Sequence, residues 1–180
     1  MTLFTPFRAK KIGVLALLTS LALIAFTLEN LLPPLFIPGA KAGLSNVFSL
    51  LALVLYGPIE AALVVAARTV LGSIFAGNAS MLLYSFTAGE VSALFAAILF
   101  GFFSKRFSLI AVSTASAALH NTVQLLVYRF LSATPAIYAY FPYLLLLGAG
   151  AGLLVGIIAQ LAVKGIPMSV FERLLNERKR

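Results

Sequence analysis

The chain has 180 residues, of which 62% are hydrophobic and 10% are charged, and its mean hydropathy is +1.07. A soluble domain carries about a quarter charged residues, so this composition indicates an integral membrane protein with room for one compact helical unit. The chain contains neither Cys nor Asp, which excludes disulfides, thiolate metal sites and the paired-aspartate Mg²⁺ site that diphosphate chemistry normally uses.

The apolar segments predict an all-α bundle of six transmembrane helices. A basic cytoplasmic arm (residues 1–11) precedes a membrane domain (12–163), and a basic amphipathic tail (164–180) follows it. The first segment ends at Glu29 without a small-residue cleavage pattern, so a retained helix is predicted rather than a signal peptide. The predicted spans are 12–29, 44–56, 59–75, 81–103, 107–131 and 137–163.

The stretch 38–46 separates the first two spans, carries Lys41 between two glycines and ends at Asn46. Prolines upstream of it prevent a continuous helix, and the following span of about 13 residues is too short to cross a bilayer alone. Irregular backbone at membrane depth must be buried in protein or line a watery cavity. The sequence therefore predicts a re-entrant, ligand-facing loop between helices 1 and 2.

The distribution of Lys and Arg sets the predicted orientation. With the N-terminus inside, ten of these residues fall on the inner side, whereas Lys41 and Arg129 fall on the outer side. Cytoplasmic loops carry this excess of positive charge. We therefore expect a multi-pass protein of a bacterial cytoplasmic membrane, with both termini cytoplasmic, the tail on the anionic lipid surface and no nucleic-acid partner.

Two ionisable residues, Arg68 and Glu90, lie within the third and fourth predicted spans. Their expected depths are roughly 12 and 15 Å below a shared outer turn, so an intramembrane ion pair is one interpretation. A ligand site is the other, because an ionisable group at this depth is costly and usually functional. The sequence leaves both open.

The fifth predicted span carries a polar stripe at spacings of three and four residues. The stripe contains Ser113, Ser116, Ala117, His120, Gln124 and Tyr128, with Asn121 on its flank. Such a stripe faces the bundle, either as interhelical hydrogen bonds worth about 0.6 kcal/mol each or as a ligand pocket. Phe48 and Tyr84 are expected to add stacking surface. A lone His without Cys or Asp offers too few ligands for a metal.

Small residues mark two further helix faces. Gly148, Gly152 and Gly156 predict a close-packing surface on the sixth span. Gly13, Ala16 and Ser20 form a similar face on the first span, for which internal packing and docking to a partner protein both remain open. No Walker-type loop, nucleophile elbow or carboxylate dyad occurs, so the sequence predicts no catalytic residues, no cofactor and no enzyme.

Three motifs carry a resemblance to a known family. The segments Pro38-Gly-Ala-Lys-Ala-Gly-Leu-Ser-Asn46, Arg68-Thr-Val-Leu-Gly-Ser73 and Ala118-Leu-His-Asn-Thr-Val-Gln124 resemble the Gx transporter family, also catalogued as heptaprenyl diphosphate synthase component I. The family is similar to the substrate-binding S-components of energy-coupling factor (ECF) transporters. Ala42 and Ser45 depart from its usual Leu and Ala. The resemblance covers residues 12–163.

The resemblance implies a six-helix subunit that captures a small molecule from outside and docks, through Gly13, Ala16 and Ser20, on an ECF coupling protein driven by ATPases. The expected ligand is vitamin-like, cofactor-like or isoprenoid-like. The expected ligand-binding residues are Lys41, Asn46, Arg68, Glu90, His120, Asn121 and Gln124. The alternative is a noncatalytic membrane accessory subunit of a heptaprenyl diphosphate synthase in quinone biosynthesis, and a structural or redox-complex scaffold is a third hypothesis.

Overall fold

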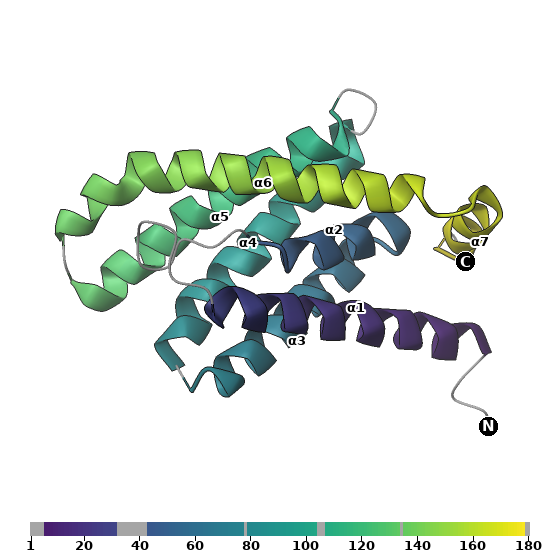
Figure 1. Ribbon diagram of the computed structural model, residues 1–180, viewed down its shortest axis with the longest axis horizontal. Helices are drawn as coiled ribbons and strands as arrows, with labels where there is room; N and C mark the ends of the chain where they lie inside the picture. Colours follow the sequence, from purple (N-terminus) through teal and green to yellow (C-terminus); the bar gives the residue numbers. More distant parts are fainter. Residues whose placement is uncertain (1–5, 32–42, 78, 104–106, 134, 179–180) are drawn as a thin grey trace.

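A computed structural model describes residues 6–31, 43–77, 79–103, 107–133 and 135–178 (Figure 1). Within these ranges the chain is helical and contains no strand. The elements are α1 (Pro6–Leu31), α2 (Asn46–Leu55), α3 (Pro58–Phe75), α4 (Ala79–Phe103), α5 (Leu109–Ser132), the 3-10 helix η1 (Pro135–Tyr140), α6 (Phe141–Lys164) and α7 (Met168–Arg178).

Five described segments are long and apolar enough to cross a membrane, so the chain is a multi-pass helical membrane protein. They are 9–29, 58–75, 79–102, 109–132 and 136–164. The remaining apolar helix, α2, has 10 residues and extends about 15 Å, which is half of a hydrocarbon core of about 30 Å. The predicted count of six spans is therefore not reached in the described part of the chain.

The ends of α2 explain why it is shorter than the 13-residue span that the sequence predicted. At its C-terminal end the N–H groups of Tyr56 and Gly57 both bond to the carbonyl of Ala52, and Gly57 has φ 123° immediately before Pro58 starts α3. At its N-terminal end Gly43 has φ 69°, a conformation that favours glycine. The predicted re-entrant loop (38–46) lies outside the described residues as far as residue 42.

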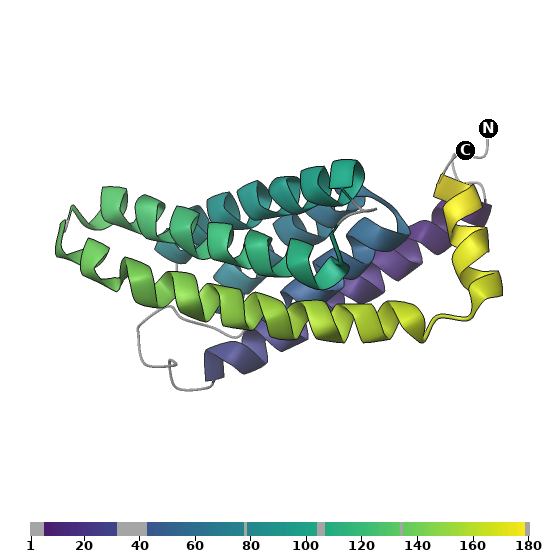
Figure 2. The same cartoon turned by 90° about the horizontal axis from the view of Figure 1, so that it is seen from above.

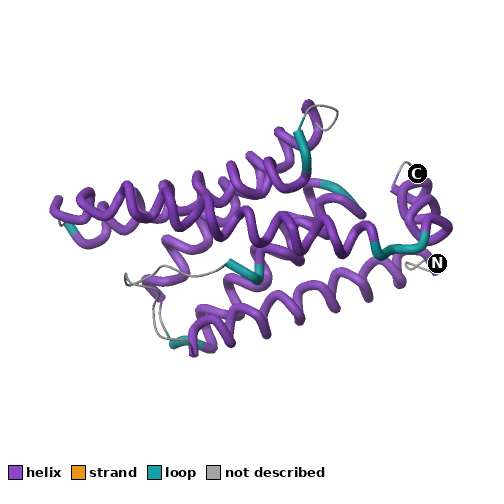
Figure 3. Tube along the Cα trace, turned by 45° about the horizontal axis from the view of Figure 1, so that its top comes forward, coloured by secondary structure: helices purple, strands orange, loops and turns teal. Residues whose placement is uncertain are grey.

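Helices α1 and α6 run along the long axis of the molecule, α3 and α4 cross it obliquely, and α2 lies between α1 and α6 (Figures 1 and 2). Neighbours in the sequence pack side by side from α3 to α6, while α1 packs against α3 and α2. The start of α1 and helix α7 lie at the same end in all three views (Figures 1–3). Helix α7 turns across this end, as an interfacial amphipathic helix does.

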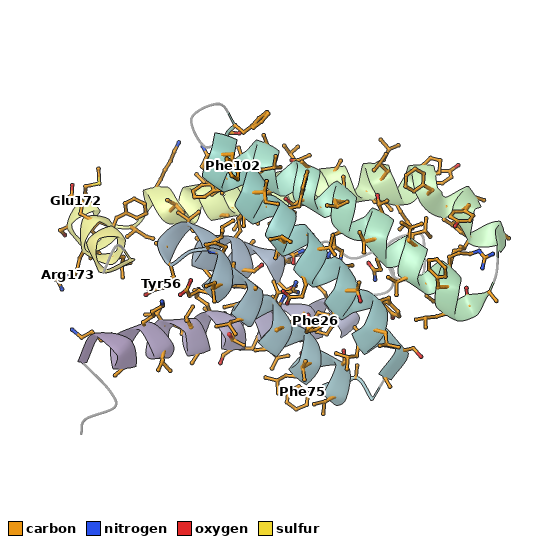
Figure 4. All side chains as sticks on the ribbon, turned by 180° about the vertical axis from the view of Figure 1, so that it is seen from behind. Phe26, Tyr56, Phe75, Phe102, Glu172 and Arg173 are labelled. Atoms are coloured by element: carbon orange, nitrogen blue, oxygen red, sulfur yellow. The ribbon has the colours of Figure 1, made fainter. Side chains whose placement is uncertain are left out.

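The interior is built around α2, whose buried residues outnumber its exposed ones because helices surround it. Leu50, Ala52 and Leu53 belong to the apolar core with Val64 of α3 and Val112 of α5. The outer faces carry large apolar side chains instead. In Figure 4, Phe75 and Phe102 point away from the bundle, and they are 70% and 82% exposed. Such faces suit a lipid environment, in which no polar surface is needed.

Helices α5 and α6 approach closely along the predicted glycine face. A Cβ atom built on Gly152 would lie 2.8 Å from both the Ser113 carbonyl oxygen and the Thr114 Cα atom. A Cβ on Gly156 would lie 2.7 Å from Ile110 Cα. Because the obstructing atoms belong to the backbone of α5, the close-packing prediction is confirmed.

The small-residue face of α1 behaves differently. Gly13, Ala16 and Ser20 are all exposed, and a Cβ on Gly13 would meet nothing within 4 Å. The internal-packing interpretation of this face is therefore wrong. Instead, the N-terminal part of α1 is attached by Lys11, which pairs with Glu60 of α3 and lies 5.9 Å from the ring centroid of Tyr56.

The glycine contacts generate a stability prediction. Gly152→Ala should lower the unfolding free energy by about 1–3 kcal/mol, because the new methyl group would overlap with the α5 backbone. Thermal unfolding of the detergent-purified protein measures this change. Gly150→Ala is the matched control, because nothing lies within 4 Å of a Cβ at that position. Equal melting temperatures for the two variants would contradict the close approach.

Candidate functional site

A polar cavity lies inside the bundle and encloses about 110 Å³. All six helices from α1 to α6 contribute to its lining, so the cavity exists only in the assembled fold. Phe26, Leu53, Val65 and Val155 are among its apolar lining residues. The polar lining residues are Glu29, Ser45, Asn46, Ser49, Arg68, Ser85, Ser92, Ser113, Ser116, His120, Asn121 and Gln124.

Five of the seven predicted ligand-binding residues meet at this cavity, namely Asn46, Arg68, His120, Asn121 and Gln124. Glu90 does not line it, and Lys41 lies outside the described residues. Asn46 starts α2, Arg68 belongs to α3, and the other three belong to α5. Their role in ligand binding stays a prediction.

The guanidinium of Arg68 is the most constrained polar group of the cavity. Arg68 is 5% exposed. One of its terminal nitrogens donates a hydrogen bond to Ser45 Oγ, and the other donates to Asn46 Oδ1 at 2.5 Å. The Nε atom is buried and has no hydrogen-bond partner. Arg68 is thus fixed in place by neutral acceptors while keeping a donor unused.

The turn that begins α2 is held from the opposite side by Glu29, a residue that sequence reasoning missed. Glu29 is 7% exposed near the end of α1, and its Oε1 atom accepts a hydrogen bond from the Leu44 N–H at 2.7 Å. The signal in the sequence was an acidic residue at the end of an apolar span. The sequence therefore marks Glu29 only as the boundary of that span. Its contact with Leu44 depends on how the helices pack together.

Arg68 and Glu90 do not form an ion pair in the described structure. Glu90 instead lines a separate recess with Pro58, Ala62, Val91 and Leu94, and its buried Oε1 atom has no hydrogen-bond partner. The ion-pair interpretation is therefore wrong.

The polar stripe of α5 lines the cavity except for Tyr128, which is exposed, and its members have different contacts. His120 Nδ1 lies 3.3 Å from Ser92 Oγ of α4, whereas Asn121 Nδ2 donates to the Leu144 carbonyl of α6 at 2.8 Å. Asn121 thus combines a place in the cavity wall with an interhelical hydrogen bond. Gln124 lines the cavity without a hydrogen bond to another described residue.

The expected stacking surface is not in the cavity. Tyr84 packs edge-on against Tyr128, with ring centroids 6.0 Å apart and an angle of 70° between the rings. Phe48 packs against the apolar core. Neither Tyr84 nor Phe48 lines the cavity, where Phe26 is the aromatic residue among the described lining residues. The sequence does not determine how α2 and α4 are rotated about their own axes, and this rotation decides which of their side chains face the cavity.

A family model described as heptaprenyl diphosphate synthase component I matches residues 18–162 of the chain. The chain belongs to this family. The match spans α2 to α5 entirely, together with the second half of α1 and nearly all of α6, and it includes every described lining residue of the cavity. No curated protein and no solved structure gives a significant match. The resemblance to component I is thereby confirmed, while the link to Gx transporters and S-components stays a prediction.

In this component I chain no group of three or more His, Cys, Asp or Glu side chains within the described ranges is arranged to hold a metal ion. The polar groups that line the cavity are hydroxyls and amides together with one guanidinium, one carboxyl group and one imidazole. Such a set can donate hydrogen bonds to carbonyl or carboxylate oxygens and accept them from N–H or O–H groups. Chemically it is suited to recognition of a polar molecule.

An experiment can distinguish the contributions of Asn121 and Gln124 to the stability of the protein. Asn121→Ala should lower the unfolding free energy by about 0.6–1.7 kcal/mol, because it removes the interhelical hydrogen bond to Leu144. Gln124→Ala should change it by less than about 0.5 kcal/mol, because no described partner is lost. Thermal unfolding in detergent provides the comparison, and a larger loss in Gln124→Ala would contradict these assignments.

Proposed function

We propose that this component I chain is a membrane subunit that binds a small polar molecule, captured from the outer face as the substrate-binding part of an uptake system. The observation that carries the proposal is the buried guanidinium of Arg68 in the cavity wall, with an unused Nε donor. Component I of heptaprenyl diphosphate synthase is a non-catalytic subunit, and the chain is accordingly not itself an enzyme.

The energetics of the cavity favour a bound molecule. A buried donor without an acceptor costs about 1–3 kcal/mol, and more when the group is charged. Ser116 Oγ is a second buried group without a partner, and it lines the same cavity. A ligand that places oxygen acceptors near Arg68 Nε and Ser116 would satisfy both groups. His120 and Gln124 would then orient it.

The size of the cavity limits what can be enclosed. Its volume of about 110 Å³ is below the range of about 300–1,000 Å³ typical of pockets for drug-sized ligands. The cavity therefore suits a small vitamin- or cofactor-like molecule, or the polar end of a longer isoprenoid-like one. Glu90, in its separate recess, is assigned no direct ligand contact under this proposal, whereas Lys41 is retained as a predicted outer contact.

The exposed face of α1 supports the proposed partnership with a coupling protein. Gly13, Ala16 and Ser20 lie open on one helix, where a helix of a second membrane protein can approach closely. The proposed orientation places both termini in the cytoplasm of a bacterial cell, with ATPases on that side. Helix α7, with its basic residues, would then rest on the inner lipid surface.

A second candidate function is a noncatalytic accessory role in heptaprenyl diphosphate synthesis. The observation that favours it is the description of the matching family, which names a component of that synthase. In this role the chain would recruit a soluble prenyltransferase to the membrane. The test is co-purification of the full chain with such an enzyme, accompanied by an increase in the activity of that enzyme.

The binding function is tested by mass spectrometry of small molecules released from the detergent-purified protein. We expect one stoichiometric ligand in the wild type and a loss of at least tenfold in Arg68→Ala and His120→Ala, because both side chains line the cavity. Tyr128→Phe is the control. It removes a hydroxyl from the same helix as His120 but outside the cavity, and it should retain the ligand. An empty wild type, or equal occupancy in every variant, would refute the proposal.

A further inference from the structure

We propose that Arg129, together with the exposed tyrosines of the α5–α6 hairpin, forms a binding site for the phosphate group of a membrane phospholipid. The site lies at the end of the molecule opposite α7, which is the outer interface in the proposed orientation. It belongs to the surface of the bundle, and it does not depend on a ligand in the cavity.

The level of Arg129 in the membrane is the first argument. The hairpin of α5, η1 and α6 forms the end of the molecule opposite α7 (Figures 1 and 2), and Arg129 lies in the last turn of α5. The spanning segment 109–132 has 24 residues and extends about 36 Å, slightly more than a hydrocarbon core of about 30 Å. The last turn of α5 therefore lies near the level of the lipid headgroups.

The missing counter-ion of Arg129 is the second argument. The chain has no Asp, and none of its Glu residues falls in the segment 91–171, which includes α5, η1 and α6. The residues outside the described ranges contain no acidic residue either. Within those ranges the ion pair joins Lys11 to Glu60, and the buried Nε atom of Arg129 has no hydrogen-bond partner. A counter-ion for Arg129 therefore has to come from another molecule.

The exposed aromatic side chains of the same hairpin are the third argument. They are Tyr128, Phe130, Tyr138, Tyr140 and Tyr143. Amphipathic aromatic rings of this kind are enriched where a membrane meets water. Tyr143 is followed three residues later on the same face of α6 by Leu146, which is also exposed. This face of α6 thus passes from an interfacial side chain to a lipid-facing one.

The chemistry of these groups favours a phospholipid over a soluble anion. A guanidinium donates two parallel hydrogen bonds to phosphate oxygens, and tyrosine hydroxyls can donate further ones. A phospholipid places its phosphate at the level of Arg129 and its acyl chains against the exposed apolar side chains below. A soluble anion would supply the charge alone.

The test uses the absence of Trp from the chain. Phe130→Trp introduces a single indole beside Arg129, at a position that is 84% exposed. The full-length protein in mixed micelles is titrated with phosphatidylglycerol whose brominated acyl chains quench indole fluorescence on contact. In this background Arg129→Gln should raise the lipid mole fraction needed for half-quenching about fivefold. Arg173→Gln, on α7 at the opposite end (Figure 4), should leave it unchanged.

Three results would overturn the inference. The first is equal half-quenching with and without the charge of Arg129, which would assign this cation to a partner protein. The second is reversal of the quenching by glycerol phosphate, which would indicate a site for a soluble phosphate. The third is equal half-quenching of the Phe130→Trp protein by brominated diacylglycerol, which lacks a phosphate, and this comparison decides if Arg129→Gln does not fold.

Discussion

The cost of placing a guanidinium inside a membrane is the constraint on which the centre of this molecule depends. Arg68 lies within a spanning helix and is almost completely buried. A charged group in this position must face protein acceptors or a polar cavity. Here it does both, because Ser45 and Asn46 accept its hydrogen bonds at the first turn of α2 and the cavity lies beside it. The hydrogen bonds of the Arg68 guanidinium therefore help to hold the first turn of α2 in position.

This coupling gives the short helix α2 its structural importance. A helix of 10 residues cannot cross the hydrocarbon core, so the backbone around Gly43 and Leu44 must be satisfied by protein groups. Glu29 of α1 accepts the hydrogen bond of the Leu44 N–H, and Arg68 of α3 holds the same turn through the side chains of Ser45 and Asn46. The buried surface of α2 then supports the core, while the tight contact of α5 with α6 closes the remaining wall of the cavity.

The two proposed functions use different parts of the same structure. A binding subunit uses the interior, where one guanidinium and a set of hydroxyl and amide groups surround a small cavity. An accessory subunit uses the surfaces, namely the open face of α1 and the terminal helix α7. Membership in the component I family favours a noncatalytic partner of a synthase, and the polar interior of this chain favours recognition of a ligand. Both roles can coexist, because they engage separate parts of the fold.

Features that depend on local periodicity were determined by the sequence alone. Its hydropathy defined a helical membrane protein, and the spacing of residues on α5 and α6 identified an inward polar stripe and a close-packing glycine face, both of which the structure contains. The tertiary structure alone decided which side chains meet. Arg68 contacts the start of α2 rather than Glu90, Glu29 belongs to the cavity, and Phe26 replaces Phe48 and Tyr84 in its wall. The reason is physical: residue spacing fixes the faces of one helix, whereas the rotation and depth of that helix relative to its neighbours arise only when all of them pack together.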